Sequence, residues 1–259
     1  MTASTASPNV HRLRPGTAQP FAPNHAWDRN FFLLYAGLIW FGILAGFGPE
    51  ILKHAQGHAK PFPLIVHFHA AAFMGWLALF TGQILLIRTR RWTAHRTLGF
   101  AMIGLAAIMA VLGPATALIA NHAKIGTPQY DPGFLSIQFT DIVAFLGLAG
   151  AAITFRNTAA IHKRLILLST IYISDAGFGR WIYSLGMTGS DLPSFWGSLY
   201  LGPTLLVAGV GAYDLITRRR LHPAYLVGLV WIAAMQVTAL SLYFSPAWKA
   251  AAGRLVALV

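Results

Sequence analysis

A small set of polar and ionisable side chains interrupts the long apolar stretches of this chain, and these side chains are the candidates for chemistry. An ionised group at the centre of a bilayer costs about 2.5–3.5 kcal/mol on insertion scales, so each one needs a reason to be there. The set comprises Glu50, His67, His69, Gln83, Gln138, Asp141, Asp175, Arg180, Asp214 and Gln236. Imidazole and carboxylate groups in such places indicate haem or metal ligation, or a path for protons or a substrate.

The histidines fall at two levels when the apolar stretches are taken as alternating membrane spans. One level holds His95, His162 and His222, and the other holds His54, His58, His67, His69 and His122. His67 and His69 are two residues apart, so they point about 200° from each other on a helix. His69 shares a stripe with Gln83, and we expect this stripe to face the bundle interior.

Helical geometry also predicts which charges meet. Asp175 and Arg180 are five residues apart, which places them about 140° from each other around one helix. We therefore expect Asp141, on the preceding span, to neutralise Arg180 within a buried charge network of Asp141, Asp175 and Arg180. Asp214 and Arg218 are four residues apart, and this spacing predicts a structural ion pair.

The composition supplies the elements that must position these residues. Of the 259 residues 56% are apolar, whereas only 10% are charged, against roughly 25% in a soluble domain. About 145 apolar side chains would fill about seven spans of about 20 residues. Cysteine is absent, which excludes disulfides, thiolate metal sites, iron–sulfur clusters and thiol catalysis.

The apolar runs predict an all-α, polytopic bundle of seven transmembrane helices within residues 31–244. We place the spans at 31–49, 64–87, 98–120, 135–155, 165–187, 196–216 and 224–244. Charged residues, Pro or Gly lie in every connection between them. Residues 1–30 have no apolar core of a signal peptide and are predicted to form a flexible tail. Residues 245–259 are too short to span and are predicted to lie on the membrane surface.

The basic residues alternate between the two sides of this arrangement. On the side of the N-terminus lie Arg12, Arg14, Arg29, Arg88, Arg90, Arg91, Arg96, Arg156, Lys163, Arg164, Arg218, Arg219 and Arg220. On the other side lie Lys53, Lys60, Lys124, Lys249 and Arg254. The positive-inside rule then predicts an inner-membrane protein with its N-terminus in the cytoplasm and its C-terminus outside. The net charge of +12 is thus explained by topology, and no nucleic-acid partner is predicted.

Small residues recur inside the predicted spans at spacings that suit close helix packing. Gly42 and Gly46 are four residues apart, and Gly177 and Gly179 lie in the fifth span. Membrane helices approach one another through such positions.

Two blocks of sequence carry a resemblance. HFHAAAFMGWLALFTGQILLIRTRRWTAHRTLGF at 67–100 and IHKRLILLSTIYISDAGFGRW at 161–181 resemble a family of uncharacterised bacterial multi-pass membrane proteins. The first block also resembles, more distantly, the di-haem cytochromes b of the ascorbate-dependent ferric reductase type. The shared features are His69, the downstream Gln83, and the His-Arg-x-Leu-Gly that begins at His95.

The cytochrome resemblance implies haem b held near each face of a central bundle. Carried over to this chain, His95 and His162 are the implied ligands of an inner haem, with Arg96 beside its propionates. An outer haem would use His69 or His67 and a histidine on the fourth span, where this chain has Gln138 and Asp141 instead. His122 is the substitute ligand. The implied function is electron transfer, with a quinone or another membrane redox partner.

Two other classes of function stay open. A membrane metalloenzyme, a hydroxylase or hydrolase of a lipid-like substrate, would bind non-haem iron or zinc through the outer set of His67, His69, His122, Asp141 and Glu50. A non-catalytic transporter or assembly subunit of a larger membrane complex would use the buried charge network instead.

Overall fold

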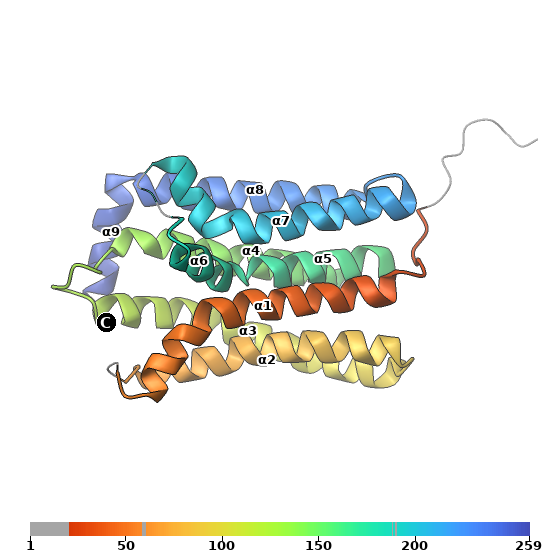
Figure 1. Cartoon of the computed structure of the whole chain (residues 1–259), viewed down its shortest axis with the longest axis horizontal. Helices are drawn as coiled ribbons and strands as arrows, with labels where there is room; N and C mark the ends of the chain where they lie inside the picture. The colour runs from red at the N-terminus through yellow and green to blue at the C-terminus, as the bar shows by residue number, and fades with distance from the viewer. Residues whose placement is uncertain (1–20, 59–60, 188, 190) are drawn as a thin grey trace, which may run out of the picture.

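The computed structural model describes residues 21–58, 61–187, 189 and 191–259, and this part of the chain is helical without strands. The long helices lie side by side along the long axis of the molecule (Figure 1). In chain order the elements are α1 (Asp28–Ala55), α2 (Leu64–Arg88), α3 (Trp92–His122), the short 3-10 helix η1 (Pro132–Phe134), α4 (Leu135–Thr154), α5 (Ala159–Tyr172), α6 (Asp175–Ser184), α7 (Leu192–Arg218), α8 (Pro223–Phe244) and α9 (Pro246–Val256).

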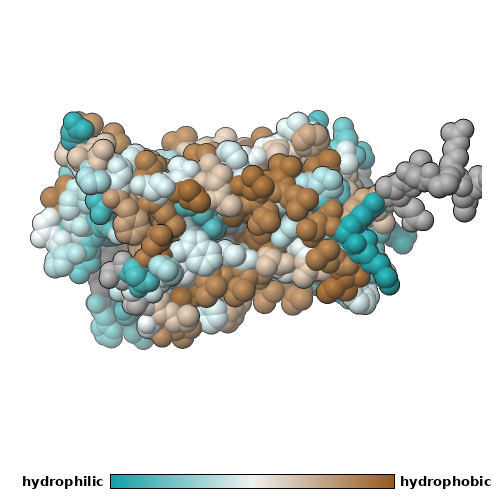
Figure 2. Space-filling view, turned by 90° about the horizontal axis from the view of Figure 1, so that it is seen from above, coloured by the Kyte–Doolittle hydropathy of each residue, from teal (hydrophilic) through white to brown (hydrophobic). Residues whose placement is uncertain are grey.

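Six of the predicted spans are present as helices long and apolar enough to cross a membrane. They are α1, α2, α3, η1 with α4, α7 and α8. Large apolar side chains such as Phe100, Val111 and Val230 are exposed on the outside of these helices. Figure 2 shows apolar residues over the middle of one face and hydrophilic residues gathered toward its two ends. This distribution is that of an integral membrane protein in a lipid bilayer.

The fifth predicted span is not the continuous helix that we expected over 165–187. The chain forms α5 and α6 instead, with Ile173 and Ser174 between them. The prediction from hydropathy was wrong here because Ser174, Asp175, Gly177 and Gly179 all disfavour a helix interior. The Ser174 hydroxyl donates to the Ile171 carbonyl, and the Asp175 carboxylate accepts from the Ala176 amide.

The segments predicted as tails make specific contacts where the structure describes them. Residues 1–20 lie outside the described part, but α1 already begins at Asp28. Phe21 lies edge-on against His222, with 4.6 Å between the ring centroids. At the other end, α9 packs on α3 and α8, and its Val256 is buried. The first described residues and the C-terminus lie at opposite ends of the bundle (Figure 1).

The core is built from apolar side chains of several helices. Trp76 of α2 lies edge-on to Phe145 of α4, with ring centroids 4.8 Å apart, and its indole N–H donates to Thr170 of α5. The predicted close packing at Gly42 and Gly46 is confirmed, since Gly46 lies against Gly177 of α6. This approach holds α6 between α1 and α7 and thereby positions Asp175 inside the bundle.

Candidate functional site

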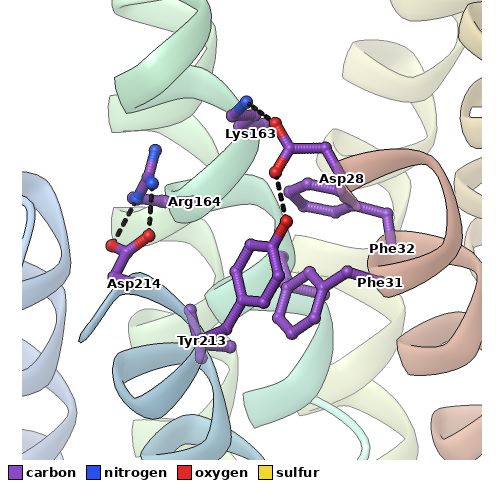
Figure 3. Close-up of a pocket in the computed structure, with 9 residues that line it drawn as sticks. Asp28, Phe31, Phe32, Lys163, Arg164, Tyr213 and Asp214 are labelled. Carbon is purple, nitrogen blue, oxygen red and sulfur yellow. Dashed lines mark hydrogen bonds and ion pairs between the residues drawn. The ribbon is translucent and has the colours of Figure 1, made fainter. Parts of the chain in front are cut away.

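The end of the bundle at which α1 begins holds a network of ion pairs between α1, α5 and α7 (Figure 3). Asp28 accepts from Lys163 at 2.7 Å, from Tyr213 at 2.6 Å and from Arg218 at 3.0 Å. Arg164 forms a two-pronged ion pair with Asp214, in which its Nε lies 2.7 Å from Oδ2. The predicted pair between Asp214 and Arg218 is also present, at 3.6 Å. The network ties three helices together, and all of these residues except Arg218 line a small cavity.

An aromatic ring, Phe21, and an imidazole, His222, lie beside this network of ion pairs. The Phe21 ring lies 4.6 Å from the Arg164 guanidinium and 5.5 Å from that of Arg218. His222 caps α8 by accepting from the Ala224 amide at 3.0 Å. Burial, and secondarily the charge of Arg164, lower the pKa of His222, which favours the neutral ring that this cap requires. His222 acts as a helix cap.

His95 and His162 approach each other at the same end of the bundle. Their ring centroids are 6.4 Å apart and their planes are nearly perpendicular, at 84°. His162 Nδ1 lies 2.9 Å from the Ala152 carbonyl, and because a carbonyl only accepts, this nitrogen carries the proton. Gln83 donates to the His95 carbonyl at 3.1 Å. His95 Nδ1 and Gln83 Oε1 are buried without a hydrogen-bond partner.

His69 lies far from this pair. It is 14 residues from Gln83 along α2, which corresponds to about 21 Å at 1.5 Å per residue. Its ring stacks on Phe73 with 4.1 Å between centroids, interacts with the Leu112 carbonyl, and is in electrostatic range of Arg180. The structure therefore brings together His95, His162 and Gln83 of the predicted cofactor ligands, with Arg96 one residue from His95, and leaves His69 apart.

The predicted non-haem metal ligands have other partners. His122 Nδ1 donates to the Val256 carbonyl at 2.9 Å. Glu50 lies 3.8 Å from Lys53 and 3.5 Å from His54, at the solvent-exposed end of α1. Within the described ranges, no group of three or more His, Asp or Glu side chains could hold a metal ion. His67 and Asp141 thus belong to no metal centre of that kind.

The buried charge network differs from the one predicted. Asp141 interacts with Asp175 and with Tyr172, whereas Arg180 is in electrostatic range of Asp175 and Glu50. In the described part of the chain, no ion pair within 4.0 Å joins Asp141 to Arg180. The prediction of that pair was wrong because it assumed one straight helix over 165–187.

Several residues of these sites gave no sequence signal of their own. Tyr172 and Tyr200 lie within apolar runs and have ordinary spacing. Asp28 lies before the first predicted span, so nothing indicated that it would bind Lys163 and Arg218, which are distant in sequence. The one usable signal was the succession His162, Lys163 and Arg164, because two adjacent basic residues at a span end need counter-charges.

Comparison with protein-family models, with curated proteins and with solved structures gives no match. The function must therefore be argued from the sites themselves.

Proposed function

We propose that this protein crosses the cytoplasmic membrane seven times, with α5 and α6 together forming the crossing that neither makes alone. The two ends of the described chain lie at opposite ends of the bundle, as an odd number of crossings requires. The end that holds Asp28, Arg88, Arg156 and Arg218 carries most of the basic residues. By the positive-inside rule this end faces the cytoplasm.

Within this framework we propose an electron-transfer protein that holds haem b between His95 and His162. The observation that carries the proposal is the separation of their rings. His95 and His162 would be the two protein ligands of the haem iron, and their rings are close enough for one iron to reach both. The observed separation is 6.4 Å.

The surroundings of the pair also suit ligation. A metal-binding histidine typically donates its second ring nitrogen to a carbonyl or carboxylate, which fixes the tautomer and the ring. His162 does so through the Ala152 carbonyl, and its Nε2 is left for the metal. His95 is held at its carbonyl by Gln83. Arg96 is the nearest basic residue in sequence for a haem propionate.

Haem held by two histidines would supply one-electron chemistry without an open coordination position for oxygen. The protein residues would orient the group and keep water from it. The electron partner we propose is a quinone or another membrane redox partner, or a larger membrane complex. One haem is favoured over two, because His69 has no second histidine at its depth on α4.

The metalloenzyme interpretation has less support, since its ligands are dispersed in the structure. The transport interpretation depends on a different place in the fold, the break between α5 and α6.

The test is an absorbance spectrum of the detergent-purified protein, produced with adequate haem supply, beside elemental metal analysis. We expect a Soret band in the wild type that is lost in His95→Ala and in His162→Ala. His54→Ala is the matched control, because His54 lies at the opposite end of the bundle and should leave the band unchanged. A His162→Met variant should keep the haem with an altered spectrum. A wild-type protein without haem would rule the proposal out, and stoichiometric iron or zinc without a Soret band would favour the metalloenzyme.

A further inference from the structure

The break between α5 and α6 lies near the middle of the bundle (Figure 1). Interrupted helices are rare at membrane depth, because the freed backbone groups must be satisfied inside the protein. Where they occur in transporters, they form ion and substrate sites. Here the interruption places Asp175 at the first position of α6, with Gly177 packed against α1.

Asp175 and Asp141 form a pair of carboxyl groups in the protein interior. The exposed fractions of the two residues are 6% and 8%. Trp76 contacts both Phe145 of α4 and Thr170 of α5, and Asp141 and Asp175 each lie about one turn beyond these contacts, at one depth of the packed helices. The two carboxyl groups are in electrostatic range of each other, and Asp141 Oδ1 is buried without a hydrogen-bond partner. Two adjacent carboxylates in a medium of low dielectric constant cannot both ionise without a cation, so the pair shares one negative charge.

Two tyrosines provide a second, independent indication that this place binds something. Tyr172 and Tyr200 are fully buried, and their rings are stacked with 6.2 Å between centroids. Both hydroxyls lack a hydrogen-bond partner at bonding distance, although both are in electrostatic range of Asp141 and Asp175. Buried hydroxyls without partners are uncommon in folded proteins, and these two can donate to the carboxyl pair.

Charged groups lie between the carboxyl pair and the end of the bundle that holds the C-terminus. Arg180, one turn and a half along α6, is in electrostatic range of Asp175 on one side and Glu50 of α1 on the other. Its guanidinium lies 4.4 Å above the Phe47 ring and donates to the Ala176 carbonyl. His69 of α2 is in electrostatic range of Arg180. Because Arg180 favours negative charge on Asp175, the proton of the pair belongs on Asp141.

We propose that Asp141 and Asp175 form a binding site for one exchangeable proton, held on Asp141. The proton comes from hydronium at the face where Glu50 is exposed, leaves water behind when the carboxyl O–H forms, and returns by the reverse step. Tyr172 and Tyr200 supply the nearby hydroxyl groups that are available to donate to the carboxyl oxygens, and Arg180 stabilises the carboxylate of Asp175. This site does not depend on haem binding at the other end of the bundle.

Infrared spectroscopy of the purified full-length protein at neutral pH tests the site, because a protonated carboxyl group has a stretching band of its own. We expect this band in the wild type, with a downward shift after exchange into D₂O. It should disappear in Asp141→Asn, and persist at a shifted frequency in Asp175→Asn. Asp131→Asn is the control, because the Asp131 carboxylate is held outside the membrane-spanning part of α4 by Tyr243 and Gly133. That variant should leave the band unchanged.

A wild-type protein without the band would overturn the proposal, as would a band that persists in Asp141→Asn or does not move in D₂O. If Asp141→Asn does not yield folded protein, Tyr172→Phe decides. Loss of the phenol hydroxyl next to Asp141 should shift the frequency of the band, and an unchanged frequency would refute the assignment. If the two carboxylates bind a sodium ion instead, neither is protonated. The wild-type protein then lacks the band, which is the first of these contrary results.

Discussion

Replacement of Asp214 by alanine is expected to lower the free energy of unfolding by about 3–5 kcal/mol, because it leaves a buried guanidinium without its counter-charge. The side chains of Arg164 and Asp214 are 4% and 1% exposed, so solvent screens this pair little. Arg218 also loses a partner at 3.6 Å. Thermal unfolding of the purified protein in detergent, followed by circular dichroism, measures the loss.

The pair of Glu50 and Lys53 is the control for this prediction. Its atoms are 3.8 Å apart, and the side chains of Lys53 and Glu50 are 64% and 47% exposed. Lys53→Ala should therefore change the stability by less than about 1 kcal/mol. The double variant Arg164→Met with Asp214→Leu should recover much of the lost stability, since it removes both charges together. Equal effects of Asp214→Ala and Lys53→Ala would contradict the prediction.

The second large effect is expected at Gly46 of α1, which packs directly against Gly177 of α6. A Cβ atom at this position would lie 2.0 Å from the Gly177 carbonyl oxygen. Because the obstacle is backbone, no side-chain rotation can relieve the clash and the helices must separate. We expect Gly46→Ala to lower the stability by about 3 kcal/mol, at the upper end of the range for overpacked sites. The measurement is again thermal unfolding in detergent.

Gly37 provides a matched control on the same helix. A Cβ atom there would have no neighbour within 4 Å, so Gly37→Ala should leave the fold and its unfolding temperature nearly unchanged. A displaced α6 would also move Asp175, and Gly46→Ala should therefore alter the carboxyl infrared band while Gly37→Ala does not. A Gly46→Ala protein as stable as the wild type would show that α1 and α6 do not pack through this glycine.

Much of the bundle could be predicted because hydropathy is a property of about 20 consecutive residues. Six spans, the close packing at Gly42 and Gly46, and the pair of Asp214 and Arg218 followed from such local patterns and are confirmed. The break at Ile173 and Ser174 did not follow, because a hydropathy average over the flanking apolar residues masks the polar Ser174 and Asp175. Without the break, Arg180 was assigned Asp141 as its partner, and the described part of the chain has no such ion pair.

The membrane class, the location of the apolar segments and the concentration of basic residues at one end were determined by the sequence alone. Each of these depends on composition along a short stretch of chain, and the bilayer acts on every stretch in the same way. Only the tertiary structure decided which polar groups meet. The proximity of His95 to His162, of Asp28 to Lys163, and of Asp141 to Asp175 depends on how each helix is rotated and tilted against its neighbours. Side-chain packing between helices sets those angles, and spacing within one helix does not contain them.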